Sequence, residues 1–447
     1  YSAESEKLQA NQFILTKRIN DANVALVAQS TKLKAAYQPD TIRLLKYQTI
    51  LCELMKNNRF QQSHWPQIKN VSQLNGFVQF QEHCPFTTKD MLAKDRIDNP
   101  PYGSNLTYPL NHYTRFHQTS GTLGVPMTWL DTPGDWQWML RNWDLVLENA
   151  GVQKGEKCFF AFSFGPFLGF WTAHDAATQR GCLCIPGGGQ SSEQRLKTIL
   201  EQKADHLFCT PTYALRLPEV AEEAGIDLSD NHLRSIIVAG ETGGSQLSFR
   251  EKIATQWHGV KVIDHYGMTE VGPVAYEIPG GQGGLRIIAD SYFPEVIDSK
   301  SGLPVAEGAL GELVLTTLGR TGCPVLRYRT GDLVRLETGM DQQGNPIFDL
   351  IGGILGRTDD MVVVRGVNLY PASVDAVIRR FNQVREYRVY KENTGSMVEI
   401  KIKIEAEPEI AKLVETELKD AFSLRIPVQS VEKGKLPRFE MKAKRWE

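Results

Sequence analysis

The chain has 447 residues, a length that suggests two or three domains. Apolar residues make up 41% and charged residues 23% of it, which predicts a globular protein and excludes a disordered one. The formal net charge of -2 comes without a dominant basic run, so we expect no nucleic-acid partner.

The apolar runs and the cysteines bear on cellular location. No apolar run approaches the roughly 20 residues needed to cross a bilayer, and we expect neither a membrane partner nor a signal peptide. The 7 cysteines favour free thiols in a reducing cytoplasm. Cys182 and Cys184 would share one face of a strand, but no second pair at ligand spacing supports a metal site there.

In the first two-thirds of the chain, the pattern of apolar residues predicts alternating helices and strands. Residues 41–60 have the apolar spacing of an amphipathic helix, and residues 11–30 suggest another. Short apolar runs then alternate with helical patterns; the runs are 157–163, 182–186, 206–209, 235–239 and 261–265. This alternation predicts a mainly parallel α/β sheet with helical crossovers.

The last third changes pattern twice. From Gly284 to about Leu350, short runs separated by Gly, Pro and Asp predict an antiparallel, barrel-like region. After Asp359 the order strand, helix, two strands, helix, strand predicts a compact α+β unit. The expected fold class is therefore α/β, with a large N-terminal domain and a small mobile C-terminal domain. The expected boundaries are 1–356 for the large domain, 357–360 for a hinge and 361–447 for the small domain.

A Ser/Thr/Gly-rich loop is the first candidate binding segment. Its glycines let backbone N–H groups approach an oxyanion, and its hydroxyls add donors, so it suits phosphate. The candidate residues are Thr119, Ser120, Gly121, Thr122 and Gly124. A plain polar turn is the alternative. The rival run Gly187–Gly189 is better explained as a turn leading to a capping box between Ser191 and Gln194.

Two neighbouring strand ends carry the next candidates. Ligands in open α/β sheets bind beyond the carboxyl ends of strands. One such end holds Ala239, Gly240, Glu241 and Thr242, and the other holds Tyr266, Gly267, Met268, Thr269 and Glu270. The tyrosine could stack on a base, the threonine reach a phosphate and the last glutamate hold Mg²⁺. Either glutamate could instead be a solvated residue at a helix N-terminus.

The remaining candidates lie toward the C-terminus. Asp332, in the run Tyr328–Leu333, could accept two ribose hydroxyls, and Arg357 could add a contact from the domain boundary. The basic tail holds Lys442 and Lys444, which without other information would be solvated residues.

The order of these segments resembles the adenylate-forming enzymes. Together with Pro85–Asp90, Cys209–Tyr213, Tyr292–Ile297 and Arg365–Pro371, they resemble the phenylacetate-CoA ligase branch. The resemblance runs from about Pro85 to the C-terminus. It implies that ATP and a carboxylic acid give an acyl-adenylate and pyrophosphate, and that coenzyme A then displaces AMP.

The resemblance also implies roles for single residues. The Gly-rich loop would hold phosphates, and the two strand ends would line the AMP site. Glu270 would bind Mg²⁺, Asp332 and Arg357 would hold the ribose, Asp359 would be the hinge, and Lys442 and Thr269 would act in catalysis. Two departures stand out. The Gly-rich loop has no basic residue, and Phe439 and Met441 flank the tail lysine, which leaves Lys444 as its alternative.

The acyl pocket is the least specified part of the site. The residues expected to line it are Phe164, Phe167, Tyr213, Ala239, Gly240 and Met268. Aromatic side chains there suit a flat aryl acid, although aromatics near a core are equally often core. His174 could contact the substrate or pack in a helix.

Three functions compete at this point. The leading hypothesis is an AMP-forming aryl-CoA ligase using ATP, Mg²⁺ and coenzyme A, with assembly as a homodimer left open. The second is a stand-alone adenylation enzyme that loads a carrier-protein thiol or an amine. The third is a nucleotide-binding protein without catalysis, against which Glu270, Asp332 and Lys442 argue.

Overall fold

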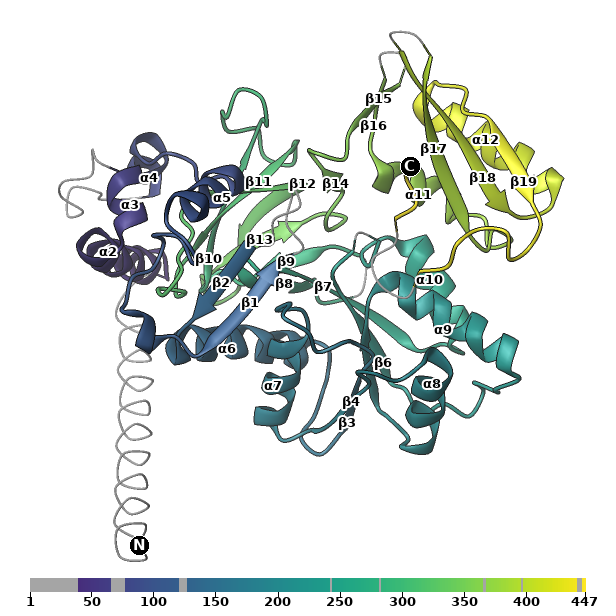
Figure 1. The fold of residues 1–447 in the computed structure, drawn as a ribbon, viewed down its shortest axis with the longest axis horizontal. Helices are drawn as coiled ribbons and strands as arrows, with labels where there is room; N and C mark the ends of the chain where they lie inside the picture. The colour runs from purple at the N-terminus through teal and green to yellow at the C-terminus, as the bar shows by residue number, and fades with distance from the viewer. Residues whose placement is uncertain are drawn as a thin grey trace, which may run out of the picture.

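The computed structural model describes residues 39–65, 77–119, 127–241, 243–280, 283–364, 367–394, 397–439 and 444–447. The chain forms a large unit around a 12-stranded mixed sheet, followed by a smaller unit with its own 5-stranded sheet (Figure 1). The helix predicted at 11–30 lies outside the described residues. None of the described helices is long and apolar enough to cross a membrane.

The described part of the large unit begins with four helices beside the sheet, one long and three short. They are α2 (Pro39–Asn57), α3 (Arg59–His64), α4 (Phe77–His83) and α5 (Lys89–Asp98). The single helix predicted at 41–60 is wrong, because Asn58 interrupts it. The Asn58 side chain accepts a hydrogen bond from the Gln61 N–H and so caps α3.

A hairpin and a long helix follow. The antiparallel pair β1 (Arg115–Thr119) and β2 (Met127–Asp131) flanks the Gly-rich loop, and its register places Thr119 opposite Met127. Helix α6 (Pro133–Asn149) starts directly after β2 with a capping box between Thr132 and Asp135. The hairpin and α6 are therefore joined with little freedom between them.

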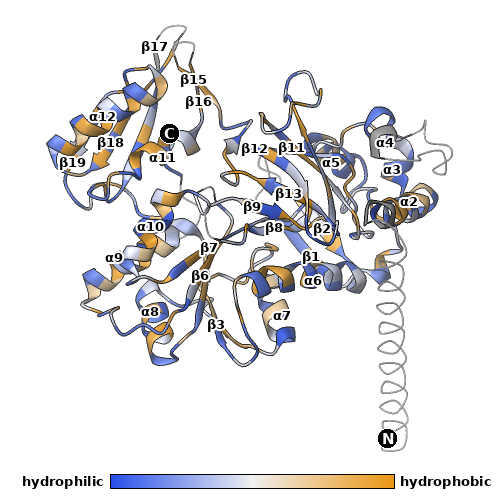
Figure 2. Ribbon diagram, turned by 180° about the vertical axis from the view of Figure 1, so that it is seen from behind, coloured by the Kyte–Doolittle hydropathy of each residue, from blue (hydrophilic) through white to orange (hydrophobic). Residues whose placement is uncertain are grey.

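The parallel half of the large sheet matches the predicted runs. Its strands, in spatial order, are β4 (Leu183–Pro186), β3 (Lys157–Phe160), β5 (His206–Cys209), β6 (Ser235–Val238) and β7 (Lys261–Met268). Its helices are α7 (Trp171–Arg180), α8 (Ser192–Glu201), α9 (Pro211–Ala224) and α10 (Leu247–Gln256). The predicted capping box of Ser191 and Gln194 is present at α8. Figure 2 shows β6 and β7 as apolar strands in the middle of this unit.

The other half of the sheet is antiparallel, as predicted, and continues from the parallel half through the pair β7–β8. Its strands are β8 (Gly272–Glu277), β9 (Leu285–Ile287), β13 (Pro346–Leu350), β12 (Tyr328–Met340), β11 (Leu310–Thr317) and β10 (Tyr292–Ile297), with β14 (Gly356–Arg357) paired to β12.

The smaller unit is the predicted α+β arrangement with one additional strand. It contains β15 (Val362–Val364), β16 (Val367–Leu369), α11 (Pro371–Ile378), β17 (Tyr387–Thr394), β18 (Met397–Glu405), α12 (Pro408–Phe422) and β19 (Val428–Val431). Its buried residues form their own cluster between the sheet and the two helices. The additional strand β16 pairs with β15 across a short connection.

Candidate active site

The carboxyl ends of β6 and β7 bring two predicted segments to one edge of the sheet. Strand β6 ends just before Ala239–Glu241, and the neighbouring parallel strand β7 runs on to Met268. Glu241 accepts a hydrogen bond from the backbone N–H of Thr212 at the start of α9 (3.1 Å). Thr242 lies outside the described residues.

Four side chains form a hydrogen-bonded chain that starts at Tyr266, near the end of β7. The Tyr266 hydroxyl donates to Asp332 Oδ2 (2.6 Å), and Arg357 Nη1 donates to Asp332 Oδ1 (2.9 Å). Arg357 Nε also donates to Asp359 Oδ1 (2.8 Å). Strands β12 and β14 set this geometry, because their register pairs Asp332 with Arg357. Arg357 therefore connects the predicted ribose carboxylate to the predicted hinge.

The electrostatics of Asp332 follow from its burial. Asp332 is 5% exposed, and burial raises the pKa of its carboxyl above the usual value, while Arg357 and Tyr266 offset part of the rise. Burial, together with the nearby Asp332 charge, raises the pKa of Tyr266 well above 10, so its hydroxyl is a neutral donor. An ionised carboxylate has about four acceptor positions. Each Asp332 oxygen can therefore accept a further hydrogen bond from a ligand.

The turn between β7 and β8 carries Thr269 and Glu270. The Glu270 side chain is buried, and its Oε1 lies 3.4 Å from Lys89 Nζ at the start of α5. Arg320 Nη1 donates to the backbone carbonyls of Thr269 (2.7 Å) and Glu270 (2.9 Å). The sequence-based prediction missed both cations. Lys89 belongs to the Pro85–Asp90 segment, whose resemblance to the family could have indicated it. Nothing in the sequence pointed to Arg320.

The residues around this turn fit a magnesium ion held partly by substrate. Among the described residues, no group of three or more His, Cys, Asp or Glu side chains could hold a metal alone. Mg²⁺ is usually bound by one or two protein carboxylates together with substrate phosphates. The buried Glu270 carboxylate meets that requirement.

Other predicted residues lie at or beyond the limits of the described chain. Thr119 ends β1, and its buried hydroxyl has no hydrogen-bond partner among the described residues. Lys444 is exposed. The residues outside the description are Ser120, Gly121, Thr122, Gly124 and Lys442.

Aromatic residues follow β3 and meet one another close to the ends of the parallel strands. The Phe164 ring contacts Trp171 edge-on (centroids 4.7 Å apart) and His174 (5.4 Å). Phe164 and Trp171 pack partly buried against the same core cluster as Ala239 and Met268. These aromatic rings therefore follow the carboxyl end of β3 and pack on the same core cluster as the residues at the ends of β6 and β7.

Two predicted pocket residues are placed differently. Tyr213 is 1% exposed and belongs to the core beneath α8 and α9, where its hydroxyl accepts from Arg195 Nη1 (2.9 Å). This position argues against Tyr213 as pocket lining. Phe167 is 38% exposed, so its ring is less enclosed than a buried pocket wall. Gly240 adopts φ of 90° at the end of β6, a conformation that favours glycine.

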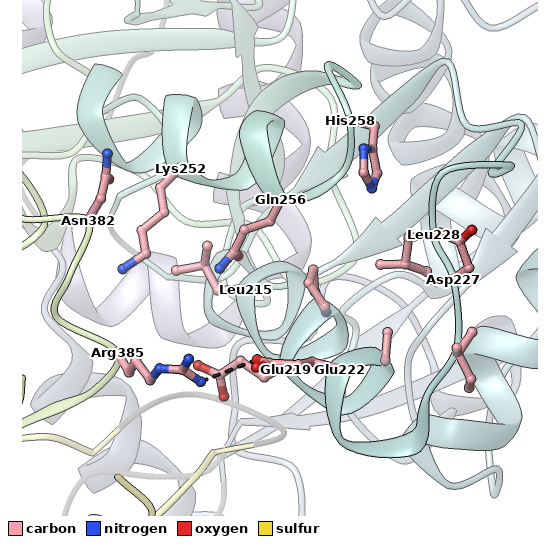
Figure 3. Close-up of a pocket in the computed structure, with 13 residues that line it drawn as sticks. Leu215, Glu219, Glu222, Asp227, Leu228, Lys252, Gln256, His258, Asn382 and Arg385 are labelled. Carbon is pink, nitrogen blue, oxygen red and sulfur yellow. Dashed lines mark hydrogen bonds and ion pairs between the residues drawn. The ribbon is translucent and has the colours of Figure 1, made fainter. Parts of the chain in front are cut away.

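A polar interface joins the smaller unit to α9 and α10. Lys252 Nζ donates to the carbonyl of Val384 (2.7 Å), and Arg438 pairs with Glu219 of α9 (3.1 Å) as well as with Glu405 of its own unit (2.7 Å). A pocket of about 420 Å³ lies beside these contacts. Figure 3 shows Lys252 facing it from α10 and Arg385 reaching Glu222 across it.

Burial gives Lys252 an unusual electrostatic state. It is 8% exposed, and burial, with Arg379 nearby, lowers the pKa of its amine to about 8. Three carboxylates, those of Glu219, Glu386 and Asp375, act in the opposite direction. The amine therefore titrates in an accessible pH range while it contacts the smaller unit.

Comparisons with known proteins agree with this arrangement. The AMP-binding enzyme family matches residues 116–320, and the AMP-binding enzyme C-terminal domain matches residues 366–446. Phenylacetate-coenzyme A ligase from Pseudomonas putida is 34% identical over 342 residues, which are 75% of this chain and 74% of that protein.

Solved structures add a comparison of shape. A 2-hydroxyisobutyryl-CoA ligase in the postadenylation state superposes with a TM-score of 0.85 at 24% identity, covering 91% of this chain and 89% of the other. In the thioesterification state the same ligase gives a TM-score of 0.69 over 91% and 89% of the two chains, again at 24% identity. The two units described here are thus arranged more like those of the postadenylation chain.

Proposed function

The chain belongs to the phenylacetate-CoA ligase family of adenylate-forming enzymes, and from that premise we propose that its acid substrate is aromatic. The enzyme is an AMP-forming acid–CoA ligase. It activates a carboxylic acid with ATP as acyl-AMP, releases pyrophosphate, and transfers the acyl group to coenzyme A with release of AMP.

The observation that carries the site assignment is the chain of contacts through Asp332. A buried carboxylate, oriented by Tyr266 and Arg357, faces the edge where β7 ends and keeps acceptor positions for the two ribose hydroxyls. The loop from Thr119 to Gly124 would bind the phosphates, while Glu241, Thr242, Gly267 and Met268 would line the rest of the AMP site.

The chemistry of the first step concerns charge on phosphate oxygens. Mg²⁺ held by Glu270 would supply positive charge to those oxygens. Thr269 would donate a hydrogen bond from the same turn, and Lys442 would bring a further positive charge from the smaller unit. Such donors accelerate the reaction when they are oriented before the charge develops.

We assign the moving boundary to residues 357–360, between a large domain (1–356) and a small one (361–447). The support is that Arg357 belongs to β14 of the large sheet, while Asp359 starts the connection to β15. Hinges absorb backbone change over a few such residues. Rotation there would carry Lys442 away and open the site to the thiol.

The aryl preference rests on the aromatic rings of Phe164 and Trp171. Flat rings pack well against aromatic edges, and such pairs add about 0.5–1.5 kcal/mol beyond area burial. All seven cysteines are free, which supports the proposed cytoplasmic location. A homodimer and a carrier-protein acceptor stay open proposals, and nucleic acid is not an expected partner.

The deciding experiment is acid-dependent ATP–pyrophosphate exchange with matched aryl and aliphatic acids, followed by detection of the CoA thioester. We expect exchange with aryl acids and thioester formation in the presence of coenzyme A. Preference for aliphatic acids would refute the aryl assignment. Exchange followed by transfer to an amine or a carrier protein, but not to coenzyme A, would favour the alternative acceptor, and no exchange with any acid would indicate a non-catalytic nucleotide-binding protein.

A variant of the proposed pocket tests the same assignment. Phe164→Ala should raise the KM for the acid and leave the KM for ATP nearly unchanged. The Phe164 ring contacts Trp171 and His174, neither of which belongs to the hydrogen-bonded chain through Asp332. Equal changes in both KM values would show a general disturbance of the site.

A further inference from the structure

Arg320 is a fully buried arginine in the loop between β11 and β12, with its side chain 0% exposed. We propose that Arg320 is a positioning residue for the adenylation step. It would hold the Thr269–Glu270 turn in a fixed relation to the hairpin that carries the Gly-rich loop. This inference rests on the proposed roles of that turn and that loop.

The guanidinium connects the two halves of the proposed ATP site. Its Nη1 donates to both carbonyls of the Thr269–Glu270 turn, at 2.7 and 2.9 Å. Its Nε donates to Asp131 Oδ1 at 2.7 Å, and Asp131 is the last residue of β2, with its side chain also 0% exposed. The Arg320 guanidinium also lies over the ring of Trp129 on the same strand, 5.3 Å from its centroid.

The backbone that carries Arg320 is itself tightly held. A Cβ on Gly319 would lie 2.2 Å from Trp138 Nε1, and one on Gly322 would lie 2.3 Å from Asp135 Oδ2, so neither position has room for a side chain. Asp135 Oδ1 accepts from the N–H groups of Thr321 (2.7 Å) and Gly322 (3.1 Å). The loop that carries Arg320 is therefore anchored to the start of α6.

Holding a carbonyl restrains its peptide plane and so restricts the direction in which the adjoining side chains leave the backbone. The Glu270 carboxylate is buried and has Lys89 as its charged neighbour at 3.4 Å, so its orientation matters for any cation that it binds. Partners of this kind are typically important for metal affinity and activity even though they touch neither metal nor substrate. Loss of the two carbonyl contacts should let the turn relax.

Arg327 provides a matched control within the same loop. It is also buried, at 7% exposure, and pairs with a buried carboxylate, Glu295, at 2.8 Å. It likewise donates to two backbone carbonyls, those of Gln81 and Cys84. Gln81 lies in the last turn of α4 and Cys84 directly follows that helix, so neither carbonyl belongs to the Thr269–Glu270 turn. Arg327 therefore makes the same kinds of contact as Arg320 with a different part of the chain.

The test compares Arg320→Lys with Arg327→Lys in three measurements. The first is pyrophosphate exchange as a function of ATP and Mg²⁺, and the second is thioester formation from supplied acyl-adenylate. The third is amide hydrogen exchange of residues 268–272 in the protein without nucleotide. For Arg320→Lys we expect adenylation to fall by about 10- to 100-fold, with a higher Mg²⁺ requirement. Thioester formation and the KM for the acid should stay near wild type, and exchange should rise in the turn.

Each alternative result has a defined meaning. Equal loss of both half-reactions, or the same loss in Arg327→Lys, would overturn the proposal in favour of a purely structural role. Unchanged adenylation and unchanged exchange in Arg320→Lys would also overturn it. If wild type itself shows no acid-dependent exchange, the proposed function fails, while the amide measurement still decides whether Arg320 holds the turn.

A second variant covers the case in which Arg320→Lys does not fold. The double variant Arg320→Gln with Asp131→Asn removes both buried charges together, so no unpaired charge is left behind. It should fold, lose adenylation to a similar extent and keep thioester formation. Full adenylation activity in this double variant would refute the proposal.

Discussion

Asp332→Ala tests the central assignment, because the structure separates the two functions of this carboxylate. One function is internal: it accepts from Tyr266 at 2.6 Å and from Arg357 at 2.9 Å. The other is the proposed contact with the ribose hydroxyls. A hydrogen bond to a charged group contributes about 1.5–3 kcal/mol, so loss of even one ribose contact should raise the KM for ATP by roughly 10- to 150-fold.

The internal contacts set the expected stability cost. Asp332→Ala leaves the buried Tyr266 hydroxyl without its acceptor, which costs about 1–3 kcal/mol. Arg357 keeps its pairing with Asp359 and is partly exposed, so it adds little to that cost. Tyr266→Phe is the matched control. It loses the same internal hydrogen bond, keeps the carboxylate, and should change the KM for ATP far less.

The assay is pyrophosphate exchange with ATP and acid varied separately, on proteins whose thermal unfolding has been measured. We expect Asp332→Ala to raise the KM for ATP much more than that for the acid. An unchanged KM for ATP in a folded variant would remove Asp332 from the ribose site. A proportional rise in both KM values, repeated in Tyr266→Phe, would show that the substitution only distorts the sheet edge.

Three further predictions address the smaller unit. Lys442→Ala should lower adenylation by roughly 100-fold or more while thioester formation from supplied acyl-adenylate survives; the same phenotype in Lys444→Ala alone would move the assignment. Asp359→Pro should keep adenylation but impair transfer to the thiol, because proline restricts φ at the proposed hinge; Asp359→Ala, which loses only the pairing with Arg357, should transfer normally, and an equal defect in both would exclude the hinge explanation. Docking of the smaller unit should strengthen as pH rises from about 8 toward 10.5, because burial lowers the pKa of Lys252 to about 8 and the docked state therefore binds fewer protons than the undocked one; labels on the two units would report this by energy transfer, and a pH response retained in Lys252→Met would contradict it.

Much of the fold was predictable because it depends on local patterns. The five parallel strands appeared as separate apolar runs, and the turn after β4 showed its capping box in the letters Ser191 and Gln194. The apolar spacing gave a wrong helix boundary where a single polar side chain interrupts the helix. Asn58 ends α2 and starts α3, although the apolar spacing continues through it.

The candidate site was predictable only where its residues lie in recognisable segments. Tyr266 lies in β7, Glu270 follows that strand and Asp332 lies in β12, and all three belong to segments that the sequence pattern marks. Arg320 and Lys89 reach the Thr269–Glu270 turn from distant parts of the chain, and such contacts leave no periodic signal. Tyr213 is the opposite case, since its aromatic ring near a strand end packs in the core beneath α8 and α9.

The contacts of Arg357 also indicate where to join two related enzymes when a chimera receives its C-terminal unit from another parent. If the junction lies before Gly356, the residue at position 357 comes from the donor enzyme. That residue must then fit the host carboxylate at position 332 and the pairing of β12 with β14. A junction after Asp360 keeps Arg357, Asp332 and Asp359 from one parent. The incoming unit would then need to match the host at α9, where Glu219 and Glu222 meet Arg438 and Arg385, and at Lys252 of α10. Chimeras cut after position 360, with those two surface pairs restored, should therefore be the easier ones to obtain in active form.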